Sequence, residues 1–128
     1  MYKRQAGGVL IGDNTTLLSS VAVVKSCFPT FTDIGHNVNV DNLVHIAHDC
    51  KVGPRSKITA GSVLCGRVSI GEQAYIGPNA TISNGISINC KGRVTLGSVV
   101  TRDVSEGQTV SGNFAREHRV FLKSLVTK

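Results

Sequence analysis

The chain has 128 residues, enough for one domain of ordinary size but not for two. With 41% apolar and 17% charged residues it is too apolar to be disordered, and its apolar runs are too short to span a membrane. The net charge of +6 comes without a nucleic-acid-binding motif, so a small phosphorylated ligand explains it equally well. Because no apolar segment follows the charged start, we expect a cytoplasmic protein.

Near the start of the chain, aliphatic residues recur every six positions, at Ile11, Leu17 and Val23. The next aliphatic position that continues the pattern is Ile34, eleven residues after Val23, so one residue is missing from a double period. We therefore predict an irregular corner or loop over residues 25–32 (KSCFPTFT).

From residue 34 to 105 the six-residue period is unbroken, and such a repeat is the first feature to interpret. Its aliphatic positions are Ile34, Val40, Ile46, Val52, Ile58, Leu64, Ile70, Ile76, Ile82, Ile88, Val94 and Val100. The residue four places after each of them is mostly compact, with Ile86 as the bulkiest exception. A period of six fits neither an amphipathic helix nor a simple meander.

The period does fit a chain that forms a short strand, turns a corner and repeats. Three such faces close a coil of 18 residues, and the coils stack as parallel strands about 4.8 Å apart. The residue after each aliphatic is small or polar, for example Gly35 and Asp41, which suits a tight turn with positive φ. We predict an all-β protein with one narrow column of aliphatic side chains.

Residues 115–126 are predicted to form a short helix with Phe121, Leu122 and Leu125 on its apolar face. Such a helix would cover the open end of the column, as terminal elements do in other repeat proteins. The basic residues of the chain cluster only in this tail, at Arg116, Arg119, Lys123 and Lys128.

The cysteines show no spacing typical of a zinc module or of a disulfide framework. Ordinary reduced thiols are therefore expected at Cys27, Cys50, Cys65 and Cys90.

The outer surface of one face of the predicted column carries residues capable of chemistry. At intervals of 18 they are His48, Gly66, Asn84 and Arg102. An imidazole can act as a general base, a bare glycine N–H can stabilise an oxyanion, and an arginine can bind a phosphate. The alternative is that His48 is a solvated surface residue.

The repeat resembles the hexapeptide-repeat family, and that resemblance implies a left-handed parallel β-helix. We expect a single domain over residues 1–128, with about five to six coils over 5–113 and the helix at 115–126. Residues 41–50 (DNLVHIAHDC) resemble the signature of the UDP-3-O-acylglucosamine N-acyltransferases of lipid A (lipopolysaccharide) synthesis. Residues 7–16 (GGVLIGDNTT) and 97–104 (GSVVTRDV) are similar to other parts of such sugar acyltransferases.

The resemblance implies a homotrimer that transfers an acyl group from acyl-CoA or an acyl carrier protein to the amine of an amino-sugar nucleotide. His48 matches the general base, Asp41 the carboxylate that orients it, and Gly66 the oxyanion donor. Asn42 is a candidate for positioning substrate. A groove between subunits would hold the pantetheine arm, with Asn84 and Arg102 as contacts. No bound metal or redox cofactor is implied, because the thioester is already activated.

The chain also departs from that family. It has no room for the family's N-terminal uridine-binding domain, and residues 83–85 (SNG) lack a second histidine. The Asp-Arg expected before the irregular corner is replaced around residues 24–26 (VKS). The acceptor sugar is therefore left open.

Two alternatives to the acyltransferase remain. His36, His45 and His48 offer nitrogen ligands for a zinc site resembling that of the γ-class carbonic anhydrases, although the spacing of His45 and His48 is narrower than in that class. The column is otherwise a non-catalytic trimeric scaffold. His118, in the predicted helix, is expected to do no chemistry.

Overall fold

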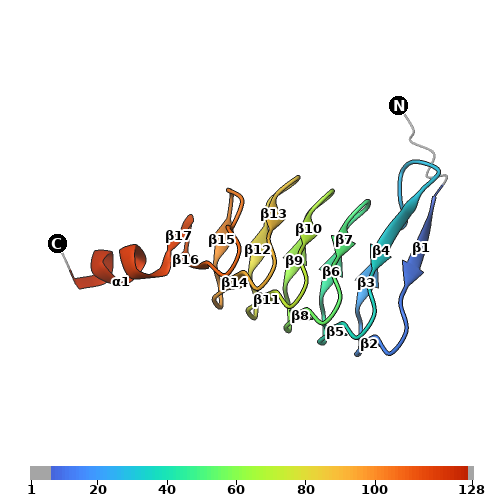
Figure 1. The fold of residues 1–128 in the computed structure, drawn as a ribbon, viewed down its shortest axis with the longest axis horizontal. Helices are drawn as coiled ribbons and strands as arrows, with labels where there is room; N and C mark the ends of the chain where they lie inside the picture. The colour runs from blue at the N-terminus through green and yellow to red at the C-terminus, as the bar shows by residue number, and fades with distance from the viewer. Residues whose placement is uncertain (1–6, 127–128) are drawn as a thin grey trace.

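In the computed structural model, which describes residues 7–126, short parallel strands form the three faces of an elongated column (Figure 1). Sheet A contains β1 (Gly8–Ile11), β4 (Phe31–Ile34), β7 (Lys51–Val52), β10 (Ser69–Ile70) and β13 (Ser87–Ile88). Sheet B contains β2 (Thr16–Leu17), β5 (Asn39–Val40), β8 (Lys57–Ile58), β11 (Tyr75–Ile76), β14 (Arg93–Val94), β16 (Thr109–Gly112) and β17 (Ala115–Glu117). Sheet C contains β3 (Ala22–Val23), β6 (His45–Ile46), β9 (Val63–Leu64), β12 (Thr81–Ile82) and β15 (Val99–Val100).

Apart from β17, successive strands of a sheet pair in parallel and in register. In sheet A, Ile34 pairs with Val52, Val52 with Ile70, and Ile70 with Ile88, so each of these steps spans 18 residues. The predicted all-β parallel solenoid is therefore present. The stacking amounts to about four turns, slightly fewer than the five to six coils expected. Residues 5 and 6 of the expected coil region lie outside the described residues.

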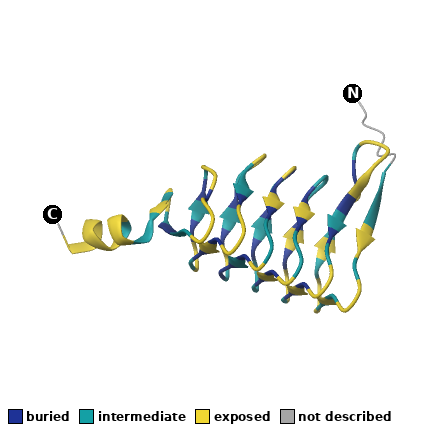
Figure 2. Cartoon of the chain, in the orientation of Figure 1, coloured by how far each residue is buried: buried dark blue, intermediate teal, exposed yellow. Residues whose placement is uncertain are grey.

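The core of the column consists of the aliphatic residues predicted from the six-residue period. All twelve, from Ile34 to Val100, are at most 3% exposed. Small residues fill the corners, and where these are polar they are hydrogen-bonded. Ser62 Oγ, for example, donates to the carbonyl oxygens of Thr59 at 2.8 Å and of Gly77 at 2.9 Å. Figure 2 shows the resulting alternation of buried and exposed positions along the coils from β4 onward.

The corners turn at a different residue from the one predicted. Positive φ falls three places after the aliphatic residue, as at Asp49 (62°) and Arg67 (60°), and not directly after it. The residue directly after the aliphatic is small because neighbouring coils approach closely there. A Cβ added to Gly71 would lie 2.5 Å from the backbone nitrogen of Cys90 in the next coil.

The irregular corner predicted over residues 25–32 is present but begins one residue earlier and ends two residues earlier. Residues 24–30 form no strand, whereas Phe31 and Thr32 already belong to β4. The corner joins sheet C to sheet A, as do the corners that carry His48 and Gly66.

The C-terminal segment differs from the prediction in two ways. Residues 115–117 form β17, which pairs antiparallel with β16, so helix α1 spans only His118–Val126. The helix extends away from the column and does not cover its end (Figure 1). Its Leu122 and Leu125 are exposed, and no residue of the helix is buried. Lys128 of the basic tail lies outside the described residues.

No helix in the described part of the chain is long and apolar enough to cross a membrane. The described cysteines form no disulfide.

Candidate functional site

The four residues predicted to stack at intervals of 18 lie on the corner between sheets C and A. The register of β6, β9, β12 and β15 stacks His48, Gly66, Asn84 and Arg102 on successive coils. The first three line one open hollow of about 440 Å³, together with Arg67 and Gly85. The structure therefore places an imidazole, a glycine and an amide at one solvent-accessible site.

The His48 ring is held by the carboxylate of the next residue, Asp49. Nδ1 lies 2.9 Å from Asp49 Oδ2, and the side chains are 37% and 12% exposed. Because the ionised carboxylate can only accept a hydrogen bond, Nδ1–H is the donor. The lone pair then resides on Nε2, on the side of the ring away from Asp49, which is the arrangement that a general base requires.

The irregular corner of the preceding coil holds Asp49 in place. The fully buried Ser26 hydroxyl donates to Asp49 Oδ1, and the Cys27 N–H donates to Oδ2 at 3.4 Å. The backbone N–H of Asp49 donates to Oγ1 of the buried Thr32 at 2.9 Å. The hydrogen bonds from Ser26, His48 and Cys27 lower the pKa of Asp49 below its usual value, although burial acts in the opposite direction. The carboxylate therefore stays ionised near neutral pH.

Gly66 is the residue that makes room for the imidazole. A Cβ at this position would lie 2.6 Å from His48 Nε2 and 2.7 Å from Cε1, well inside van der Waals contact. Among the described residues, the Gly66 N–H has no protein acceptor, since the corner hydrogen bonds use its carbonyl oxygen and the N–H groups on either side. The bare N–H and the free face of His48 thus border the same hollow.

The structure corrects the prediction that Asp41 orients His48. Asp41 lies on the corner between sheets B and C, one corner before His48, and its Oδ1 accepts from the backbone N–H of Asn42 at 2.8 Å. A strand separates successive corners, so six residues carry the chain to another edge of the column. Asn42, predicted to position substrate, shares the corner of Asp41 and does not line the hollow of His48.

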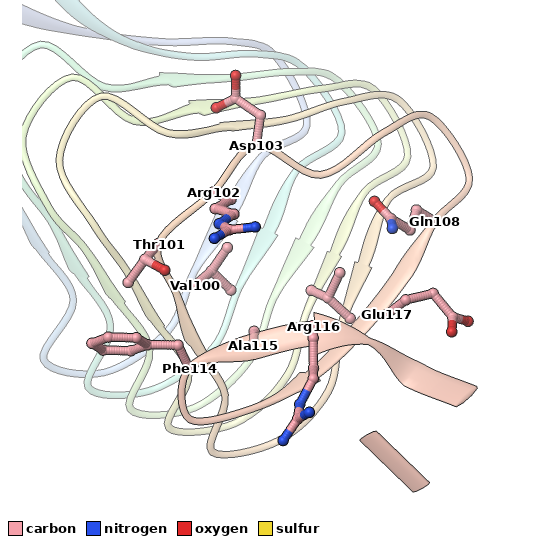
Figure 3. A pocket seen from close by; sticks show the side chains of 10 residues that line it. Val100, Thr101, Arg102, Asp103, Gln108, Phe114, Ala115, Arg116 and Glu117 are labelled. Atoms are coloured by element: carbon pink, nitrogen blue, oxygen red, sulfur yellow. The ribbon is translucent and has the colours of Figure 1, made fainter. Parts of the chain in front are cut away.

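Arg102 follows Asn84 in this stack of four residues, but it lines a second hollow, of about 420 Å³, at the C-terminal end of the solenoid. Figure 3 shows Arg102 between Asp103 and Phe114, with Arg116 on β17 below them. Phe114 is 68% exposed. This hollow therefore combines cationic groups with an apolar surface.

The histidines considered as zinc ligands do not come together within one chain. His36 lies on the corner between sheets A and B, beside Asn37, and His45 is an exposed residue of β6. Within the described residues, the grouping with metal-ligating potential is instead Cys27, His48 and Asp49. His118 lies 2.8 Å from Ser111 Oγ, away from this corner.

The sequence analysis missed Asp49, Ser26 and Cys27. Asp49 could have been predicted as the partner of His48, because it directly follows His48 in the chain. Ser26 and Cys27 had a weaker signal, since the broken period between Val23 and Ile34 marks an unusual corner on the face that carries His48.

The comparisons with known proteins also indicate a parallel β-solenoid built from six-residue repeats. Residues 31–66 match the family described as bacterial transferase hexapeptide (six repeats). Those residues span β4 to β9 and include the pair itself.

Among curated proteins, UDP-3-O-acylglucosamine N-acyltransferase 1 of Sulfurimonas denitrificans is 32% identical over 120 residues. The match covers 93% of this chain and 37% of that protein. The chain thus spans little more than a third of the length of this relative.

Solved structures share the fold. The UDP-N-acetylglucosamine acyltransferase of Arabidopsis is 26% identical, with a TM-score of 0.84 over 95% of this chain and 44% of that one. A variant of the GDP-perosamine N-acetyltransferase of Caulobacter crescentus, in complex with CoA and GDP-perosamine, is 24% identical. Its TM-score is 0.71, over 87% of this chain and 53% of that one.

Proposed function

We propose that this chain transfers an acyl group from a pantetheine thioester, acyl-CoA or an acyl carrier protein, to the amine of an amino-sugar nucleotide. The observation that carries the proposal is the His48–Asp49 pair lying against the bare Gly66 corner, with both bordering one open hollow. The relatives support the reaction class, because each of those described above is named as an acyltransferase or acetyltransferase.

In the proposed mechanism His48 Nε2 removes a proton from the acceptor amine as its nitrogen attacks the thioester carbonyl. The carbonyl oxygen gains negative charge and accepts a hydrogen bond from the Gly66 N–H. When the intermediate collapses, the carbon–sulfur bond breaks, and the thiolate takes the proton held by His48. The products are an amide and a free pantetheine thiol.

Asn84 and Arg102, which stack on the same corner as His48 and Gly66, would hold the substrates. Asn84 lines the hollow of His48 and offers both a donor and an acceptor to the bound molecules. Arg102, in the adjacent hollow, offers a fork of donors to a phosphate of the donor or of the nucleotide. No role is assigned to Asp41, because it lies on another corner.

We further propose a homotrimer in which neighbouring chains close these open hollows. Leu43 and Leu96, on the corner between sheets B and C, are 67% and 74% exposed and supply apolar surface for such contacts. Sedimentation equilibrium measures the assembly directly. A trimer mass supports this arrangement, whereas a monomer at micromolar concentration contradicts it.

The activity is tested by thiol release from acetyl-CoA and from a hydroxyacyl carrier protein, each with a panel of UDP- and dTDP-linked amino sugars. We expect His48→Ala to lower turnover by about 100-fold or more, as for loss of a general base. His45→Ala is the matched control, since His45 is an exposed histidine three residues away whose loss should leave the rate unchanged.

Equal rates for His48→Ala and the wild type would contradict the general-base assignment. An absence of turnover with every substrate pair would contradict the transferase itself and favour a scaffold.

A further inference from the structure

A third side chain that could bind a metal ion lies beside the His48–Asp49 pair. The irregular corner over residues 24–30 brings Cys27 to the same edge of the column, where its backbone N–H donates to Asp49 Oδ2. One ligand atom each from Cys27, His48 and Asp49 lie within 4.8 Å of one another. A thiol, an imidazole and a carboxylate therefore converge at one point of the surface.

This donor set matches the ligand preferences of Zn²⁺, which binds thiolate, imidazole and carboxylate groups at about 2.0–2.3 Å. Around a tetrahedral ion such ligand atoms lie about 3.3–3.8 Å apart. The three ligand atoms, all within 4.8 Å of one another, are already close to that spacing. Three protein ligands also leave one position open, as in zinc sites that bind a further molecule.

The surroundings provide the support that a metal site requires. The buried Ser26 hydroxyl holds Asp49 Oδ1, and Oδ2 is directed toward His48 and Cys27. Hydrogen bonds of this kind fix the orientation of metal-ligating carboxylates. All three ligand residues are partly exposed, so an ion can enter from solvent. The nearby Cys50 is no competitor, because it is fully buried and its Sγ donates to the carbonyl oxygen of Cys65 at 3.1 Å.

We propose that Cys27, His48 and Asp49 form a binding site for Zn²⁺ or a similar soft divalent ion, and that the bound ion inhibits the enzyme. The ring atom nearest Asp49 is Nδ1, so the ion takes Nδ1 in place of its hydrogen bond. The imidazole proton then resides on Nε2, and His48 loses the lone pair that would accept the amine proton. Binding also releases the Cys27 thiol proton to solvent.

The binding part of this inference is independent of the transferase activity, whereas the inhibition rests on the proposed function. Binding is tested first, by titrating the full chain with Co²⁺ as a spectroscopic substitute for Zn²⁺. We expect a near-ultraviolet thiolate-to-cobalt charge-transfer band that Zn²⁺ abolishes. Cys27→Ser should lose the band, and Cys90→Ser, which removes an exposed thiol elsewhere, should retain it.

A second measurement on the wild-type chain covers the case in which Cys27→Ser does not fold. We expect Zn²⁺ to slow alkylation of Cys27, located by peptide mass spectrometry, without slowing that of Cys90. The proposed site is wrong if the wild type gives no cobalt band, if the band persists in Cys27→Ser, or if Zn²⁺ leaves the alkylation of Cys27 unchanged.

Inhibition is tested in the thiol-release assay. Cys27→Ser keeps the His48–Asp49 pair, so we expect the uninhibited rate to be retained and the Zn²⁺ concentration for half-inhibition to rise at least 10-fold. An unchanged half-inhibition concentration contradicts inhibition through this site. A cobalt band in a protein without transferase turnover would preserve the metal site and overturn the proposed function, and turnover without a band would do the reverse.

Discussion

At the scale of single residues, the properties of His48 depend on contacts that come from three different coils. Asp49 fixes its Nδ1, Gly66 of the next coil leaves space for its ring, and Ser26 of the preceding coil holds Asp49. Each contact can be removed separately, so the contribution of each coil to the proposed reaction can be measured.

The first prediction separates the two carboxylates. Asp49→Asn replaces the acceptor for Nδ1–H with an amide and should lower kcat by about 10- to 100-fold, as for other partners that orient a reactive histidine, with KM little changed. Asp41→Asn alters a carboxylate that bonds Asn42 on another corner, and its kcat should match the wild type. Steady-state kinetics of both variants check this. A loss confined to Asp41→Asn would restore the original assignment.

The second prediction concerns the space beside the imidazole. Gly66→Ala places a methyl group 2.6 Å from the present position of His48 Nε2, so the ring must move. A displacement of about 1 Å at a reacting group costs about 100-fold in rate, and we expect a loss of that order. The melting temperature, measured alongside, should change little because a half-exposed side chain can shift. A fully active Gly66→Ala protein would show that the hollow beside Gly66 is not the reaction site.

At the scale of elements, the six-residue period predicted the strands and the buried positions well. One aliphatic per face is a local rule, and every coil obeys it, so all the positions from Ile34 to Val100 are buried as expected. The period does not specify how a corner turns. Both the small residue directly after the aliphatic and the residue two places later are compatible with a turn. The prediction placed positive φ at the first of these two residues, whereas it falls at the second.

The site was predicted only in part for a related reason. Periodicity states which residues share a corner, and it correctly placed His48, Gly66 and Asn84 together. It carries no information on the path of the irregular corner over residues 24–30, whose Ser26 and Cys27 lie against Asp49. The prediction that the helix covers the column end was wrong, because the apolar face of Phe121, Leu122 and Leu125 does not specify which surface it packs against.

The third prediction tests the assignment of the corner positions. Gly71→Ala directs a methyl group onto the backbone of the next coil, 2.5 Å from the Cys90 nitrogen, and should lower the free energy of unfolding by about 1–3 kcal/mol. Gly97→Asn is the control, because Gly97 has positive φ with open space around it and Asn79 adopts the same conformation. Its change should stay within about 0.5 kcal/mol. Denaturant titrations measure both values, and the reverse order would contradict the assignment.

At the scale of the whole molecule, the column is a stack in which each coil contacts only the coils before and after it. An aliphatic residue in the middle of the stack is therefore covered on both sides. At the first coil the equivalent position, Ile11, is 45% exposed, whereas Ile76 in the middle is 0% exposed. The burial that stabilises the fold is thus concentrated in the central coils, next to the His48 corner.

The last prediction follows from this gradient. Ile76→Ala removes a fully buried side chain and should lower the free energy of unfolding by about 2–5 kcal/mol, because stacked coils on both sides cannot collapse into the cavity. Ile11→Ala removes a side chain that pairs with Ile34 at only one face, and its cost should stay below about 1.5 kcal/mol. Urea unfolding of the two variants at one protein concentration gives both values. Equal costs would mean that another surface covers the first coil in solution, and repeating the titration over a range of protein concentrations would then show whether that cover is a second copy of the chain.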